Sequence, residues 1–271
     1  MTIAAGRMVF AAVVLLPAAL SARRRREKQP PWRLALLAGI ALALHFSTWI
    51  SSLQYTTMAA STVIVTSNPV WVAVIDAIQR RRLPSRLTSL GLTVCMAGAL
   101  ALAWSNNAPS AHASAPLLGN SLALLGAWSA TAYYLMGRQA QSSGASLTSM
   151  ATWIYASAAL VLAALSAATG SIQRIGQPGV WPWLLALALV PQLVGHTSFH
   201  WAMKHRSATA VTSVILLEPI GATALGFVFF SESPEISTLL SGGVLLLGVW
   251  LTTLGERGRV EESPSRAVDQ G

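Results

Sequence analysis

An acid and a proline stand side by side in the apolar run SVILLEPIGATAL, residues 213–225. Glu218 and Pro219 fall near the middle of a segment long enough to cross a bilayer, where a charged side chain costs roughly 2.5–3.5 kcal/mol. The proline removes a backbone donor and interrupts the hydrogen bonding of the preceding turn. A carboxyl group beside a broken helix is suited to bind a proton or a solute. A packing acid whose own proton bonds a neighbouring carbonyl is the alternative, and both interpretations stay open.

A similar pair occurs 150 positions earlier, at Asn68 and Pro69. A helix broken near the midplane is a common way to build a solute site in a transporter. Asparagine offers two donors and an acceptor without carrying a charge, although an intramembrane asparagine can also simply join neighbouring helices. Because its counterpart is Glu218, the sequence favours a place beside a central cavity for Asn68, with Pro69 and Pro219 as helix breaks.

Two pairs of residues are spaced so that each pair shares a helix face: His45 with Trp49, and His196 with His200. Two histidines at this spacing resemble part of a zinc site, but the glutamate of an HExxH motif and further ligands are missing. The sequence therefore predicts no metal, and packing against other helices is the leading interpretation. A weaker alternative gives His196, near mid-membrane, a part in proton exchange.

Aromatic side chains with a polar tip suit an amphipathic solute. Trp49 lies in the predicted span 33–53, and Trp128 and Tyr133 lie in the predicted span 117–137. Tryptophan and tyrosine near span ends more often anchor a helix at the membrane interface. Trp49 and Trp128 lie deeper, so they remain candidates for contact with the solute, together with Tyr133.

Basic residues are absent from the predicted midplane. Lys204 and Arg206 lie at a predicted inner mouth, where they set topology and would be the first contact of an anionic solute. A midplane without a cation argues against nucleotide sugars or sugar phosphates as the main cargo.

The composition excludes an ordinary soluble domain. Of the 271 residues 54% are hydrophobic and only 10% are charged, whereas soluble domains carry about 25% charged residues. Apolar runs of roughly 20 residues, the length that crosses a bilayer, recur along the chain. The net charge of +9 lies in clusters between these runs, so it indicates topology and contact with the lipid bilayer rather than with nucleic acid. The predicted fold class is an all-α polytopic membrane protein.

The orientation follows from the basic residues. Nine spans are predicted, and with Arg23–Arg26 in the cytoplasm all but Arg7 and Arg174 of the 18 basic residues fall inside, as the positive-inside rule requires. The prediction is a multi-pass protein of the plasma (inner) membrane with a cytoplasmic C-terminus and an extracytoplasmic Met1. The spans are 3–22, 33–53, 58–79, 87–104, 117–137, 148–169, 181–201, 209–230 and 236–254.

An internal repeat relates the two halves of the chain. SLQYTTMAASTVIVTSNPVWVAV (52–74) aligns without gaps with AMKHRSATAVTSVILLEPIGATA (202–224). The predicted orientation sends the paired segments across the membrane in opposite directions, which is the inverted-repeat plan of secondary transporters.

The predicted domains are a first repeat of four spans at 1–104, a second repeat of five spans at 117–254, and a polar cytoplasmic tail at 255–271. The counterpart of 117–137 would precede Met1, so the first helix of the five-helix bundle is missing from repeat one and nine spans stand where ten are expected. Loss of that helix and a start codon placed too far downstream are the two explanations, and the unmatched repeat favours the second.

Four segments carry a resemblance to a known family: AAGRMVFAAVVLLP (4–17), HFSTWISSLQYTTMAASTVIVTSNPVWVAV (45–74), GHTSFHWAMKHRSATAVTSVILLEPIGATALGFVFFSE (195–232) and GGVLLLGVWL (242–251). Together they resemble the drug/metabolite transporter (DMT) superfamily, in particular its EamA-domain transporters. The resemblance covers nearly the whole chain. It implies ten spans in two five-helix repeats and small-solute transport, commonly export of amino acids, metabolites or drugs.

The sequence thus predicts a secondary transporter of a small metabolite or drug-like solute, an exporter that works by alternating access through a central cavity between the repeats. Coupling to a proton or to an exchanged solute is expected, because the phosphate-binding loop GxxxxGK[ST] is missing, and no cofactor is predicted. An enzyme is not expected, since the chain has no GxSxG or HExxH motif and Glu218 is its only deep acid. A non-transporting sensor or accessory subunit is the alternative, and an intramembrane enzyme is less favoured. Small-residue patterns allow a homodimer as well as packing within one bundle.

Overall fold

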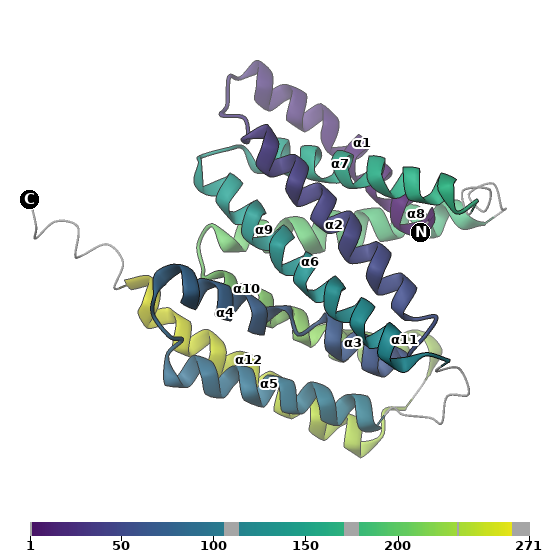
Figure 1. The fold of residues 1–271 in the computed structure, drawn as a ribbon, viewed down its shortest axis with the longest axis vertical. Helices are drawn as coiled ribbons and strands as arrows, with labels where there is room; N and C mark the ends of the chain where they lie inside the picture. Colours follow the sequence, from purple (N-terminus) through teal and green to yellow (C-terminus); the bar gives the residue numbers. More distant parts are fainter. Residues whose placement is uncertain (1, 106–113, 171–178, 232, 262–271) are drawn as a thin grey trace, which may run out of the picture. The chain divides into compact units, whose positions relative to one another are not determined.

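The chain folds into helices, which confirms the predicted fold class. A computed structural model describes residues 2–105, 114–170, 179–231 and 233–261, and these residues form helices and connecting turns without a strand (Figure 1). The elements are α1 (Thr2–Arg24), α2 (Trp32–Ser52), α3 (Met58–Val65), α4 (Asn68–Arg80), α5 (Arg86–Ser105), α6 (Pro116–Ser142), α7 (Leu147–Ala168), α8 (Val180–Leu187), η2 (Ala188–His196), α9 (Thr197–Met203), α10 (Ala208–Ser213), η3 (Val214–Leu217), α11 (Glu218–Phe230) and α12 (Ile236–Glu261).

Eight helical stretches within the described residues are long and apolar enough to cross a membrane. They correspond to eight of the nine predicted spans. The ninth prediction, 117–137, falls on α6, which is a long helix but is not among the eight. Polar side chains such as Asn120 and Ser121 lower its hydropathy, and a helix that packs against other helices can carry them.

The helices form two compact units. Unit 1 comprises Met1–Ser51 and Trp128–His205, and unit 2 comprises Ser52–Ala127 and Arg206–Gly271. Their boundaries fall inside α2 and α6, so each unit takes helices from both predicted repeats. The predicted repeats describe the order of the helices along the chain, whereas the units describe which helices pack together.

The repeat is visible in unit 2 where the helices begin. α3 and α10 begin at residues 58 and 208, α4 and α11 at 68 and 218, and α5 and α12 at 86 and 236. Thr57 and Ser207 cap α3 and α10 in the same way, each accepting a 3.1 Å hydrogen bond from the backbone N–H three residues further on. α4 and α11 are both followed by a left-handed residue, Arg81 (φ 51°) and Ser231 (φ 57°). Local backbone structure thus follows the repeat.

α5 and α12, which are equivalent in the repeat, pack side by side in opposite directions (Figure 1). A Cβ atom on Gly248 would lie 2.5 Å from the backbone nitrogen of Cys95, and one on Gly98 would lie 2.9 Å from that of Leu245. Cys95 and Leu245 are equivalent in the repeat, as are the two glycines. Each helix therefore contacts the other through the same positions, as across a twofold axis, and this pair supports an inverted relation of the repeats.

The equivalent helices α4 and α11 differ in burial. Asn68 is 2% exposed and Val72 is fully buried, whereas their counterparts Glu218 and Ala222 are exposed. In unit 2, α6 lies beside the segment that leads into α3, and Asn120 accepts a 2.8 Å hydrogen bond from the hydroxyl of Thr56.

α12 continues into residues that the sequence assigned to a polar tail. Gly255 lies against α5, where a Cβ atom would come 2.5 Å from the backbone nitrogen of Thr88. Glu256 is 3% exposed and accepts a 3.0 Å hydrogen bond from the Thr88 hydroxyl. These contacts extend the helix through Glu261, so residues 255–261 are helix rather than tail, and residues 262–271 lie outside the described residues.

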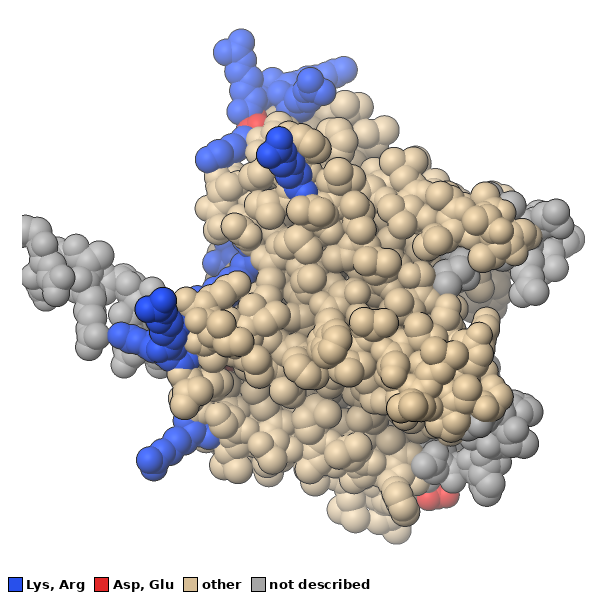
Figure 2. All heavy atoms as spheres, viewed as in Figure 1, with Lys and Arg blue, Asp and Glu red and all other residues tan. Residues whose placement is uncertain are grey.

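Several basic residues lie at helix ends, and Figure 2 shows lysine and arginine side chains in blue groups on an otherwise mostly tan surface. In unit 1, Arg23 and Arg24 end α1. The backbone carbonyl of Lys28, which follows them, accepts a 3.0 Å hydrogen bond from the backbone N–H of Ser146, directly before α7. In unit 2, Arg80 ends α4 and Arg86 begins α5. This is where a membrane protein carries its positive charge.

Candidate functional site

The predicted site residues fall in both units. Unit 1 contains Trp49, Trp128, Tyr133 and His196, and unit 2 contains Asn68, Glu218, Pro69 and Pro219. Two of them lie on α6 but on different sides of it, because five residues at 3.6 per turn separate their directions by about 140°. Tyr133 is accordingly fully buried, while Trp128 is 45% exposed.

The two predicted helix breaks coincide with interruptions in the helices. α3 ends at Val65, and Pro69 lies in the first turn of α4. The short 3₁₀ segment η3 precedes α11, and Pro219 lies in the first turn of that helix. Proline is tolerated there because its missing N–H would have had no partner within the helix. Glu218 thus becomes the first residue of α11, where the helix dipole favours a negative charge.

A third interruption, which the sequence did not indicate, lies in unit 1. The span Val180–Met203 changes from α8 into the wider π-helix η2, which contains Pro191. The proline cannot bond the fourth preceding carbonyl, and a widened turn accommodates it. Tyr155 of α7 stabilises this segment, since its hydroxyl lies 3.3 Å from the carbonyl oxygen of Gln192 and 3.0 Å from the hydroxyl of Thr197. These contacts join the widened turn to α7 within unit 1.

His196, at the end of η2, is surrounded by aromatic rings. Its Nδ1 lies 3.5 Å from the hydroxyl of Tyr133 and 3.4 Å from that of Tyr134. The ring of Tyr134 is nearly parallel to the imidazole, at 10° and 6.2 Å between centroids, and Phe46 meets the imidazole edge-on at 6.0 Å. The predicted residues Tyr133 and His196 are thus brought together, with Tyr134 and Phe46 as neighbours.

Trp49 lies on the same side of α2 as Phe46. Its ring stacks on that of His45 at 5.8 Å and 24°, as the helical spacing predicted, and its centroid lies 6.4 Å from that of Phe46. Trp49 and His45 are half-buried, while Phe46 is 2% exposed. The two half-buried rings form the accessible part of an aromatic cluster with a buried base.

Arg7 supplies a cation to this cluster. Its guanidinium carbon lies 4.1 Å from the centre of the Phe46 ring, and its Nη2 donates a 2.8 Å hydrogen bond to Oε1 of Gln192. Gln192 lies midway along the span Val180–Met203. The structure thus places a basic group beside the middle of a span, where the sequence analysis predicted none, because the side chain extends from the beginning of α1 to the centre of its neighbour. A lone arginine in an apolar run was the signal that could have revealed it.

Gln192 is fully buried, and its Nε2 has no hydrogen-bond partner among the described residues. The orientation of the amide is fixed by its neighbour, since a guanidinium can only donate and therefore must face the oxygen. A buried donor without a partner costs about 1–3 kcal/mol. Gln192 is thus a buried polar side chain at the centre of a span with a donor that no described residue uses.

His200 has a packing environment. Its side chain is fully buried, it meets the ring of Tyr133 edge-on at 4.9 Å, and it fills the space beside Gly137, where a Cβ atom would lie 2.2 Å from the imidazole. Groups of three or more His, Cys, Asp or Glu side chains placed to hold a metal ion do not occur among the described residues.

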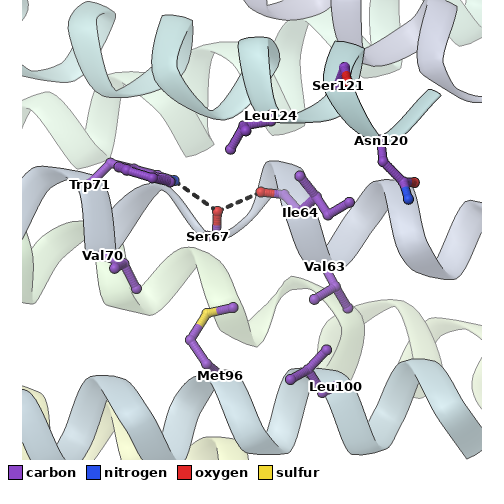
Figure 3. Close-up of a pocket in the computed structure, with 10 residues that line it drawn as sticks. All are labelled: Val63, Ile64, Ser67, Val70, Trp71, Met96, Leu100, Asn120, Ser121 and Leu124. Carbon is purple, nitrogen blue, oxygen red and sulfur yellow. Dashed lines mark hydrogen bonds between the residues drawn. The ribbon is translucent and has the colours of Figure 1, made fainter. Parts of the chain in front are cut away.

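Unit 2 contains a cavity of about 510 Å³ at the interruption between α3 and α4 (Figure 3). Ser67 lies at the break, where its hydroxyl donates a 2.6 Å hydrogen bond to the carbonyl of Ile64 and accepts one of 3.2 Å from the indole N–H of Trp71. Met96 of α5 and Asn120 of α6 line other walls. The cavity is largely apolar, and its polar groups lie at the helix break and on α6.

A second cavity of unit 2, of about 320 Å³, lies between α11 and α12. Ile220 and Leu246 line it, and they are the repeat counterparts of Val70 and Met96 in the first cavity. The repeat thus builds related hollows beside both interrupted helices, while only the first has α6 as a wall.

Comparison with known proteins identifies the relatives of this chain. Residues 1–104 and 117–254 match the EamA-like transporter family. An uncharacterized transporter of Archaeoglobus fulgidus is 31% identical over 74 residues, 27% of this chain and 27% of that protein. A second uncharacterized transporter of the same organism is 21% identical over 221 residues, 81% of this chain and 75% of its own length. A solved crystal structure has the same fold, with a TM-score of 0.73 at 18% identity over 94% of this chain and 88% of that one.

Proposed function

Because this chain belongs to the EamA-like transporter family, we propose that it is a secondary transporter that exports a small metabolite or drug-like solute by alternating access. The proposal starts from a chain that is a multi-pass membrane protein and a member of a transporter family. The reciprocal antiparallel packing of α5 and α12 carries the proposal, because two repeats inserted in opposite senses can exchange conformations to open a site to one side and then to the other.

The solute contact is proposed for unit 1, at the cluster of Arg7, Trp49, Tyr133 and His196. This cluster combines a cation, stacked aromatic rings and an imidazole beside an interrupted helix. Solute sites in transporters lie near the midplane at such interruptions. Trp128, Asn68 and Glu218 remain proposed contacts, and the solute or a proton is the proposed ligand of Glu218.

A binding screen followed by flux measurements tests the proposal. The purified chain is screened with amino acids, polyamines and drugs for solutes that raise its melting temperature, since a ligand stabilises the state it binds. Each solute found is then loaded into proteoliposomes under an imposed pH gradient. Saturable flux above that of empty liposomes is expected. A solute that binds but never crosses would refute transport and favour a sensor.

Glu218→Gln is expected to abolish proton-driven flux while the melting temperature stays within about 2 °C of the unchanged chain, because the amide cannot exchange a proton. Glu235→Gln is the matched control, since this exposed acid lies in the connector before α12. Proton-driven flux at the normal rate in Glu218→Gln would disprove the coupling role.

The proposed location is the plasma (inner) membrane, with the basic helix ends and the C-terminus in the cytoplasm and Met1 outside. The basic residues at one end of α4 and α5 support this orientation. A reporter fused after residue 271 that is active only in the cytoplasm tests it, and a fusion active only outside would reverse the orientation.

A further inference from the structure

We propose that the cluster in unit 1 binds solutes that carry an anionic group on a flat apolar body, with Arg7 binding the anion. This inference rests on the proposed function and specifies its substrate class. It follows from three features of the cluster: a cation fixed in position, a buried donor beside it, and a pair of stacked rings.

Arg7 is held in one orientation. The face of Phe46 lies 4.1 Å from its guanidinium carbon, and Gln192 accepts a 2.8 Å hydrogen bond from Nη2. A guanidinium carries a permanent charge and presents a planar fork of five donors, which matches the oxygens of a carboxylate or phosphate. Phe46 and Gln192 are both uncharged, so these contacts orient the guanidinium without neutralising its positive charge. The side chain is half-buried, so part of its surface is accessible.

Gln192 adds a second donor. Its Oε1 faces Arg7, which leaves Nε2 directed elsewhere, buried and without an acceptor among the described residues. An oxygen of an anionic solute would satisfy it, whereas an ammonium group has no acceptor to offer. Both groups therefore select against cationic solutes. Gln192 also positions Arg7, because its Oε1 holds the guanidinium in place.

The flat body of the solute is placed by the rings of His45 and Trp49. They are stacked at 5.8 Å and 24°, and both are half-buried. Phe46, whose ring lies beneath Arg7, is 6.4 Å from Trp49 between ring centroids. A planar group stacks favourably on such a surface, in an offset or edge-on geometry. A solute with a carboxylate next to an aromatic ring would satisfy both parts of the cluster.

Three matched compounds test the inference on the purified full chain: indole-3-acetate, indole-3-acetamide and tryptamine, which share a ring and differ in charge. We expect indole-3-acetate to bind at least tenfold more tightly than the neutral amide, and tryptamine to bind most weakly, by isothermal titration. Equal affinities, or tighter binding of tryptamine, would overturn the proposal.

Gln192→Glu separates anion binding from folding. The introduced carboxylate has the same shape and pairs with Arg7, so the chain is expected to melt at or above its normal temperature while the preference for indole-3-acetate falls at least tenfold. Arg33→Gln is the control, because Arg33 is exposed and lies over the ring of Trp32, away from the cluster residues named above. The affinities of this variant for the three compounds should change less than twofold. A Gln192→Glu chain that retains the preference would refute the role of Arg7.

The same measurements distinguish this inference from the proposed function. Saturable flux of a cationic or neutral solute, with no preference for indole-3-acetate, would leave transport standing and overturn the anion site. Tight binding of indole-3-acetate without flux of any solute would support the anion site and overturn transport.

Discussion

Replacement of Gly248 by alanine tests the close packing of α5 on α12. The added Cβ atom would lie 2.5 Å from the backbone nitrogen of Cys95 and 2.7 Å from its sulfur. The backbone nitrogen cannot move independently of α5, so the helices must separate. Overpacking of this kind costs about 1–3 kcal/mol, and a clash with the backbone places the value at the upper end.

Gly243 is the matched control on the same helix. A Cβ atom there meets nothing within 4 Å, so Gly243→Ala should have no packing cost and should gain up to about 1 kcal/mol from helix propensity. Since the same gain applies to Gly248→Ala, the difference between the variants isolates the clash. Gly98→Ala should fall between them, because its nearest contacts are longer, 2.9 Å to the nitrogen of Leu245 and 3.0 Å to its Cγ.

Cys95 itself reports the unfolding. It is the single cysteine of the chain and is fully buried, so a thiol-reactive fluorogenic dye labels it only when α5 and α12 come apart. At roughly 2–4 °C per kcal/mol, Gly248→Ala should melt several degrees below Gly243→Ala. Equal melting temperatures for these two variants would show that α5 and α12 do not approach each other closely, and would remove the main support for the inverted repeat.

Two further substitutions test individual hydrogen bonds. Glu256→Ala removes the acceptor of the Thr88 hydroxyl at a buried site and should lower the free energy of unfolding by about 1–3 kcal/mol. Glu235→Ala, at an exposed site, should change the melting temperature by less than 1 °C. Similar melting temperatures for the two variants would place Glu256 outside the folded unit. Tyr155→Phe removes the hydroxyl that contacts Thr197 and the η2 backbone. In the same melting assay this variant should lose about 0.5–1.5 kcal/mol of stability. An unchanged melting temperature would show that η2 does not depend on the Tyr155 hydroxyl.

The fold could be predicted from the sequence because its determinants are local. Apolar runs, basic clusters and prolines act within one helix or one turn, and they indicated eight spans that the structure contains as apolar helices. The offset of 150 positions predicted that Pro69 and Pro219 are equivalent, and both lie in the first turn of a helix. The length of α12 was underestimated because contacts with α5, rather than hydropathy, hold residues 255 and 256 in place.

The site could be predicted only in part, because it depends on how helices pack. Tyr133 and His196 were candidates for their side-chain chemistry, but no sequence pattern indicated that the two side chains meet. Arg7 was assigned to the extracytoplasmic side from the predicted orientation. Its depth is decided instead by the neighbour that its side chain reaches, Gln192 in a span 185 positions away. Only packing sets that distance, so no pattern within α1 could supply it.

Packing between helices also explains why equivalent positions of the repeat carry an amide at Asn68 and an acid at Glu218. They occupy equivalent positions, each at the start of a helix that follows an interruption, so both side chains meet the favourable field of a helix N-terminus. Position 68 is buried, and there an uncharged amide avoids the large cost of removing a carboxylate from water. Position 218 is exposed, so a carboxyl group there is not enclosed by other helices of the described chain. Burial therefore explains why the enclosed position carries an uncharged amide, and it leaves Glu218 as the member of the pair for which we propose proton exchange.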